Sequence, residues 1–229
     1  MTRGTLGIWA VSVLALWFVG PRLLGFQSWE WHQKLVLEVN TPHGLVSGGS
    51  TIAAGVSLDP KWLPSNGGGG HSWIKGESSF VEVSPGKYLF AVLRDQDEID
   101  RAVHAFASKI QAFDGTTGQV FHTLETTRGT ERVPRPIYPT LVTFDDLSDP
   151  SSVRAVDPDH LDTVFGPGVT LNRITLEITN HRITRGSLEA VLKWIPNHYG
   201  THFDGARYET ISAPNRLANA LTSGAFKVP

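Results

Sequence analysis

The chain has 229 residues, no cysteine and a formal net charge of −2 at pH 7. The missing cysteine excludes thiol nucleophiles, disulfide bonds, iron–sulfur clusters and cysteine-ligated zinc. The basic residues form no stripe, so counterion release has little to act on and we expect no nucleic-acid partner. About 200 residues remain beyond the apolar N-terminal segment, which is enough for one compact domain.

The N-terminal segment is the most apolar part of the chain. Residues 6–19 carry no charge, and a second apolar patch, 23–26, follows Pro21 and Arg22. Together these stretches have roughly the 20-residue length of a tilted membrane-spanning helix. We therefore expect residues 1–26 to be an uncleaved signal-anchor that crosses a membrane once. Five apolar side chains define this anchor: Leu6, Trp9, Leu14, Trp17 and Phe18.

Two alternatives to the anchor stay open. The 6–19 run is also close to the length of the apolar core of a secretory signal, about 7 to 15 residues, although large side chains stand where a signal peptidase needs small ones. A helix buried in a soluble globule is the other alternative. For an anchor, the simplest arrangement is a short tail inside and residues 27–229 outside, which in a bacterium is the periplasm.

Two β-hairpins are predicted in the first half of the remaining chain. Apolar residues alternate over 35–39, before a turn at 41–44 and a returning strand. A second hairpin is predicted from strands 80–83 and 88–92, which flank a Ser-Pro-Gly-Lys turn. A glycine-rich loop, 64–71, connects the two hairpins.

The middle of the chain predicts one helix clearly. Asp95 and Glu98 have capping-box spacing, and apolar residues recur every three or four positions as far as Ile110. We expect this helix to pack against a sheet. The polar, threonine-rich segment 115–132 predicts either another hairpin, through 120–124, or a long loop.

The next elements are a strand and a short helix with defined ends. Residues 141–144 predict an inner strand. In the helix that follows, Asp157 is placed to cap the first turn, Pro158 suits that turn, and Gly166 is placed to end the helix in a left-handed conformation.

The last third predicts a strand and two more helices. The alternation over 169–178 changes phase, so we expect a β-bulge near Asn172 and Arg173 to restore one buried face. Helices are predicted at 188–195, ending at a proline, and at 215–222. The whole pattern predicts the α+β class: one domain over 27–229 with a mainly antiparallel sheet and three or four short helices.

The best cluster of chemically active residues is a short loop that contains His198, His202 and Asp204. Two imidazoles and a carboxylate are ligands that a divalent metal accepts, and they also suit a general base with its orienting acid. Asp145 and Asp146 follow the predicted strand 141–144, where oxygen ligands for Mg²⁺ or Ca²⁺ often gather. In both clusters, ordinary surface and turn residues are the competing interpretation.

These observations favour a non-enzymatic function. The sequence has no Gly-x-Ser-x-Gly nucleophile elbow. We expect a membrane-anchored extracytoplasmic domain that binds a protein or cell-envelope component and needs no cofactor. The alternative is a membrane-anchored, metal-dependent hydrolase that uses His198, His202 and Asp204.

Overall fold

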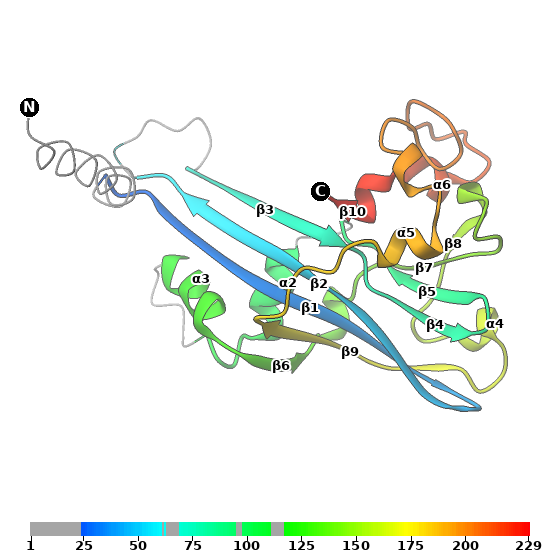
Figure 1. Ribbon diagram of the computed structural model, residues 1–229, viewed down its shortest axis with the longest axis horizontal. Coiled ribbons are helices and arrows are strands. Elements are labelled where there is room, and N and C mark those ends of the chain that lie inside the picture. The colour runs from blue at the N-terminus through cyan, green and yellow to red at the C-terminus, as the bar shows by residue number, and fades with distance from the viewer. Residues whose placement is uncertain (1–23, 61, 63–68, 95–97, 111–116) are drawn as a thin grey trace, which may run out of the picture.

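The computed structural model describes the following residues: 24–60, 62, 69–94, 98–110 and 117–229. They form an α+β domain built on antiparallel sheets, as the sequence predicts (Figure 1). The predicted anchor, including Leu6, Trp9, Leu14, Trp17 and Phe18, lies outside the described residues except for its last three positions. Among the residues that are described, no helix combines the length and the apolar character needed to cross a membrane.

Two sheets contain all ten strands of the described chain. The larger sheet has the order β10-β3-β2-β1-β9-β6, and the smaller has the order β4-β5-β7-β8. The strands of the larger sheet are β1 Gln27–Thr41, β2 Gly44–Leu58, β3 Gly70–Glu77, β6 Gly129–Arg132, β9 Thr170–Thr179 and β10 Lys227–Val228. Those of the smaller sheet are β4 Phe80–Ser84, β5 Lys87–Ala91, β7 Leu141–Phe144 and β8 Val153–Ala155.

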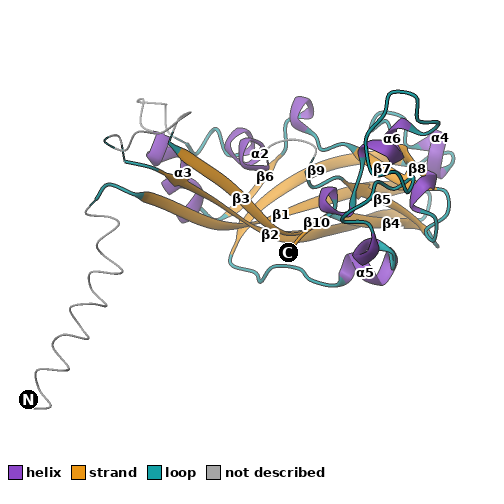
Figure 2. Ribbon diagram, turned by 90° about the horizontal axis from the view of Figure 1, so that it is seen from above, coloured by secondary structure: helices purple, strands orange, loops and turns teal. Residues whose placement is uncertain are grey.

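Five short α-helices occur in the described residues, one more than the largest number expected. They are α2 Glu98–Ala105, α3 Thr117–Thr126, α4 Asp162–Phe165, α5 Ser187–Val191 and α6 Arg216–Ala220. Four 3₁₀ turns accompany them: η1 Arg135–Ile137, η2 Pro150–Ser152, η3 Ile195–Asn197 and η4 Ser223–Ala225. In Figure 2, α3 lies toward the end of the molecule where β1 starts, whereas α4 and α6 lie with β7 and β8 at the other end.

The hairpin of β1 and β2 is the longest feature of the fold. Its strands pair without a break from Gln27 opposite Leu58 to Thr41 opposite Gly44. Every second residue of β1 from Trp31 to Val39 is buried, which confirms the predicted alternation. The hairpin starts earlier than predicted, and the loop expected at 64–71 ends earlier, since Gly70 and His71 already belong to β3.

The smaller sheet meets this hairpin at Gly48, and the neighbouring Gly49 lies equally close to β1. A Cβ atom on Gly48 would lie 2.1 Å from the carbonyl oxygen of Phe80, and one on Gly49 would lie 2.3 Å from that of Leu35. Only glycine permits such an approach. The Ser79 hydroxyl accepts a hydrogen bond from the Ser50 amide and donates one to the Leu35 carbonyl. One side chain thereby bridges both strands of the hairpin.

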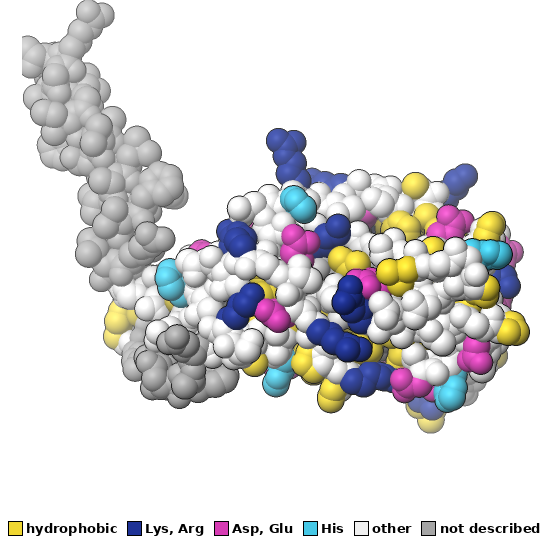
Figure 3. Space-filling view, turned by 90° about the horizontal axis from the view of Figure 1, so that it is seen from below, with side chains coloured by type: hydrophobic (Ala, Val, Ile, Leu, Met, Phe, Trp, Pro, Cys, Tyr) yellow, Lys and Arg dark blue, Asp and Glu magenta, His cyan; other side chains and the backbone are white. Residues whose placement is uncertain are grey.

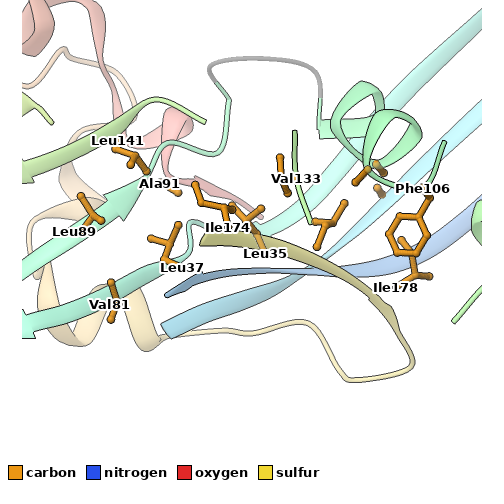
Figure 4. Packing of buried hydrophobic residues seen from close by; sticks show 14 of the residues in the cluster. Leu35, Leu37, Val81, Leu89, Ala91, Phe106, Val133, Leu141, Ile174 and Ile178 are labelled. Carbon is orange, nitrogen blue, oxygen red and sulfur yellow. The ribbon is translucent and has the colours of Figure 1, made fainter. Parts of the chain in front are cut away.

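Strands β5 and β7 lie between two hydrophobic cores. Leu89 and Leu141 face the larger sheet, and Figure 4 shows Leu89 near Leu37 of β1. Phe90 and Phe144 face the C-terminal segment on the other side. A strand buried on both faces reads as a continuous apolar run, which is why 141–144 was predicted as an inner strand. The second predicted hairpin is confirmed as β4 and β5.

The expectation for 115–132 is wrong, because residues 117–126 form helix α3. Val120 and Leu124 are four residues apart and both are buried. Phe121 packs on the rings of Trp29 and Trp31, with centroids 5.6 and 6.5 Å away. The hydroxyl of Thr123 donates to the carbonyl of the residue four positions earlier, so this β-favouring residue is accommodated in a helix.

The predicted helix over 99–110 is confirmed in its first part as α2, which packs against the β1–β2 hairpin and α3. Its capping residue Asp95 lies outside the described residues, and Ile99, Phe106 and Ile110 are buried. The Trp31 indole donates to the Gln33 side chain, which in turn donates to the backbone carbonyl of Glu98. The helix therefore joins the sheet through polar as well as apolar contacts.

The bulge in β9 is confirmed. Glu38 of β1 faces Arg173, whereas the next residue, Val39, faces Leu171, so Asn172 is the additional residue. With this insertion, Ile174 and the apolar residues that follow face the core in phase with β1. The bulge also turns Asn172 outward, where its amide donates to the Glu38 carboxylate.

The helices after β8 differ from the prediction in their length. Asp157 does not cap a helix; its carboxylate accepts the Asp159 amide in a local turn, and α4 begins only at Asp162. Gly166 ends α4 with φ 105° and ψ 167°, which is outside the left-handed helical region. The helix predicted over 188–195 is divided into α5 and η3.

The C-terminal helix is confirmed in shorter form. Asn215 caps α6, and its side-chain oxygen accepts the amides of Leu217 and Ala218. The same side chain donates to the carbonyls of Ser151 and Val153, which ties α6 to the start of β8.

Glu77, at the end of β3, is a buried carboxylate that caps α5. Its side chain is 1% exposed and accepts hydrogen bonds from the backbone amides of Gly186, Ser187 and Leu188 at 2.9 to 3.2 Å. Backbone amides at a helix start have no partner within the helix, and an anion satisfies them best.

Replacing this carboxylate destabilises the fold. We expect Glu77→Ala to lower the free energy of unfolding by about 3 kcal/mol, because three buried amides lose their acceptor. Urea unfolding of the full-length chain in detergent micelles, followed by tryptophan fluorescence, measures this change. The control is Glu209→Ala at an exposed position, which shifts the free energy by no more than about 0.5 kcal/mol. Equal effects of the two substitutions would contradict the role of Glu77.

Candidate functional site

An open groove of about 560 Å³ lies where β6, the loop before α4 and the bulge of β9 meet. We call it the arginine groove. Its lining residues are Arg132, Val133, Pro134, Arg135, Tyr138, Pro158, Asp159, Leu171 and Asn172. The volume falls within the range of about 300 to 1,000 Å³ that is usual for small-molecule and cofactor sites.

Three local features of the sequence shape this groove. Pro134 and the proline after Arg135 fix the backbone as it leaves β6 and form the 3₁₀ turn η1. The Asp157 turn places Asp159 on the opposite wall. The bulge places Asn172 at the rim instead of in the strand ladder.

The charges of the groove are not balanced. Arg135 lies 5.1 Å from the ring centroid of Tyr138, and its guanidinium is 2.6 Å from the Asp159 carboxylate. Arg132 has no carboxylate within ion-pair distance in the described part of the chain. Two guanidinium groups and one carboxylate give the lining a net charge of +1. Figure 3 shows Lys and Arg side chains interspersed with Asp and Glu on the face seen from below, the side on which β6 and β9 lie in Figure 1.

This arrangement suits binding of an acidic group. The planar guanidinium of Arg132 presents donors in the geometry of a carboxylate or phosphate, and the Tyr138 ring, with Arg135 over it, belongs to the same lining. The groove therefore has the groups needed to recognise an anion.

The predicted histidine loop is bonded within the fold. The His198 Nδ1 atom lies 3.2 Å from the carbonyl oxygen of Trp194, and its ring packs edge-on against that indole. The Asp204 carboxylate accepts the side-chain amide of Asn219 and the backbone amide of Ala206. His202 Nδ1 is buried without a hydrogen-bond partner.

These side chains do not assemble as metal ligands. Across the described segments, no group of three or more His, Asp or Glu side chains is placed to hold a metal ion. His198, His202 and Asp204 instead surround Phe203, whose ring lies 4.8 Å from that of Trp194. The loop lies where it does because this aromatic residue enters the C-terminal core.

Asp145 and Asp146 lie close to this loop in the fold but are bonded elsewhere. Phe144, just before them, contacts the rings of Trp194 and Phe203. The Asp145 carboxylate pairs with Arg154 at 2.8 Å, and the Asp146 carboxylate accepts the amide and hydroxyl of Ser148. The aspartate pair and the histidine loop are thus neighbours because aromatic rings beside them pack together. Their polar side chains do not form a common site.

Sequence reasoning did not find the arginine groove. Its lining comes from three segments, 132–138, 158–159 and 171–172, which are separated along the chain. The one local signal was the phase change in β9, which predicted the bulge at the rim. Comparison of this chain with protein-family models, with curated proteins and with solved structures finds no match.

Hydrogen bonds from Ser148 lower the pKa of Asp146 below its usual value. The hydroxyl contributes most, followed by the backbone amide, because both stabilise the charged carboxylate. We expect Ser148→Ala to raise the pKa of Asp146 toward the value of a free aspartate. A carboxyl ¹³C NMR titration measures it, with the Asp159 signal as an internal reference. An unchanged Asp146 titration would show that the hydroxyl does not stabilise the charge.

Proposed function

We propose that this chain is a membrane-anchored extracytoplasmic domain that binds an acidic group of a protein or cell-envelope component in the arginine groove. The observation that carries the proposal is Arg132, a guanidinium without a carboxylate partner in the described residues, beside Arg135 and Tyr138 in a groove of ligand size. The uncharged run 6–19 supports the anchor. An anchor raises the concentration of the domain near other components of the envelope.

The geometry gives no comparable support to a metal-dependent hydrolase. His198 and Asp204 already have hydrogen-bond partners, and these partners belong to the fold around Phe203. A metal site would require them to leave these partners and turn toward one point with His202. Binding at Arg132 requires less rearrangement, because this side chain is exposed and Arg135 can keep its ion pair with Asp159.

The anchor is tested with the full-length chain in cells. We expect the protein to sediment with membranes and to stay there after an alkaline carbonate wash, because hydrocarbon surrounds the 6–19 run. Leu14→Arg reduces the membrane-bound fraction, since a cation at the centre of a spanning helix costs about 3 kcal/mol. Leu45→Arg, at an exposed site on the hairpin, is the control. Wild-type protein in the soluble fraction would refute the anchor.

The groove is tested with full-length protein in nanodiscs of zwitterionic lipid. A fluorescein-labelled oligoglutamate peptide is the probe, and fluorescence anisotropy gives its affinity. We expect Arg132→Ala to weaken binding about tenfold, because one charge-assisted hydrogen-bonded contact is lost. Arg154→Ala, which removes an exposed arginine paired with Asp145 on the smaller sheet, is the matched control.

Ionic strength provides a second criterion for the groove. Added salt weakens the affinity of the wild type for oligoglutamate, since exposed charges are screened. Equal losses in Arg132→Ala and Arg154→Ala, or a wild-type affinity that does not respond to salt, would show that the groove is not the binding site.

A further inference from the structure

An exposed aromatic cluster lies at the start of β1. Leu24 is 55% exposed and Trp62 is 62% exposed, and both are large apolar side chains. The ring of Phe26 packs edge-on against that of Trp62, with centroids 6.5 Å apart. We call Leu24, Phe26 and Trp62 the aromatic end.

The aromatic end has a defined geometry. The Trp62 indole N–H donates to the carbonyl of Leu24 at 2.8 Å. This hydrogen bond joins the segment before β1 to the segment after β2 at the open end of the hairpin. Gly25, with φ 87°, makes the turn that permits this contact, and a Cβ atom there would lie 3.2 Å from Pro60. The ring is thereby held with its polar atom satisfied and its apolar faces exposed.

The position of this cluster along the chain is decisive. Val19 ends the uncharged run, and the described chain begins five residues later at Leu24; the last three positions of the predicted anchor, 24–26, are a turn before β1 and not helix. Five residues span at most about 17 Å. If the run lies in hydrocarbon, the aromatic end is therefore within reach of the headgroup layer. Indole rings favour that layer, since they combine an apolar body with a polar edge.

We propose that the aromatic end inserts into the membrane–water interface and fixes the domain against the bilayer. This inference rests on the anchor of the proposed function. It extends that proposal, because the folded domain itself would bind the lipid surface. Residues 24–29 carry no charge and Arg22 and Lys61 flank the cluster in the sequence, so the aromatic side chains supply the apolar part of the contact. The rim of the arginine groove, at Glu38, then lies roughly 35 Å along β1 from the aromatic end.

The lack of cysteine allows a direct test in the full-length chain. An environment-sensitive fluorophore is attached at Trp62→Cys, at Leu24→Cys or at Leu45→Cys in separate variants. Each protein is reconstituted in phosphatidylcholine vesicles that contain a phosphatidylcholine spin-labelled near the headgroup. Leu45 is the matched control, because it is 57% exposed and belongs to the same hairpin, close to its turn.

We expect the spin label to quench the probes at positions 24 and 62 roughly threefold more strongly than the probe at position 45. We expect iodide in the aqueous phase to quench the probe at position 45 more strongly than the probes at positions 24 and 62. The variant at position 24 keeps the Trp62 ring, so its result does not depend on loss of that ring. Equal lipid quenching at all three positions would overturn the inference. Shielding from iodide at 24 and 62 without lipid quenching would also overturn it, and would indicate a protein partner or a second copy.

Flotation of the vesicles separates the two proposals. Protein that floats with the vesicles but shows no lipid quenching at 24 and 62 has an anchor without an inserted aromatic end. Protein that does not float has no anchor, and the proposed function then fails together with this inference.

Discussion

The close approach of β4 to the β1–β2 hairpin determines the arrangement of the two sheets. Gly48 leaves no side chain between the hairpin and the backbone of Phe80, Gly49 lets β2 lie close to Leu35 of β1, and the Ser79 hydroxyl bridges Ser50 and Leu35. The smaller sheet is therefore held across one half of the hairpin. A larger residue at either glycine would place its Cβ atom within about 2.3 Å of a carbonyl oxygen, far inside contact distance.

This junction creates the two cores. One face of the smaller sheet completes the core beneath the hairpin, and the other face receives the C-terminal segment with its cluster of phenylalanine and tryptophan rings. The buried carboxylate of Glu77 lies next to the junction and fixes the start of α5. The buried pair of Glu98 and Arg101 joins α2 to the carbonyl of Ile137, at the segment that forms the arginine groove. Polar groups thus set the positions of elements that apolar packing alone leaves adjustable.

The hairpin also separates the two surfaces for which we propose a binding function, the aromatic end and the arginine groove. Its open end carries Leu24 and Trp62, and Glu38, near its turn, contacts Asn172 at the rim of the groove. An unbroken ladder of paired residues connects these ends. If the open end lies at a lipid surface as we propose, this ladder keeps the groove at a set distance from it.

The sequence by itself determined the elements whose signals are local. Alternation and turn residues gave both hairpins, a continuous apolar run gave β7, and the phase change in β9 gave the bulge at Asn172. These signals suffice because side-chain period and turn chemistry act within a few residues. The candidate ligands His198, His202 and Asp204 were adjacent in sequence, but adjacency does not specify where side chains point.

Only the tertiary structure decided the remaining features. Residues 117–126 form a helix because Val120 and Leu124 face the sheet and Phe121 meets the Trp29 and Trp31 rings, contacts that join segments far apart in sequence. The position of the histidine loop is set by Phe203, whose ring packs in an aromatic core. The arginine groove forms where three segments meet that are distant in sequence. Propensity and spacing do not encode such contacts, since they depend on which surfaces the folded chain brings together.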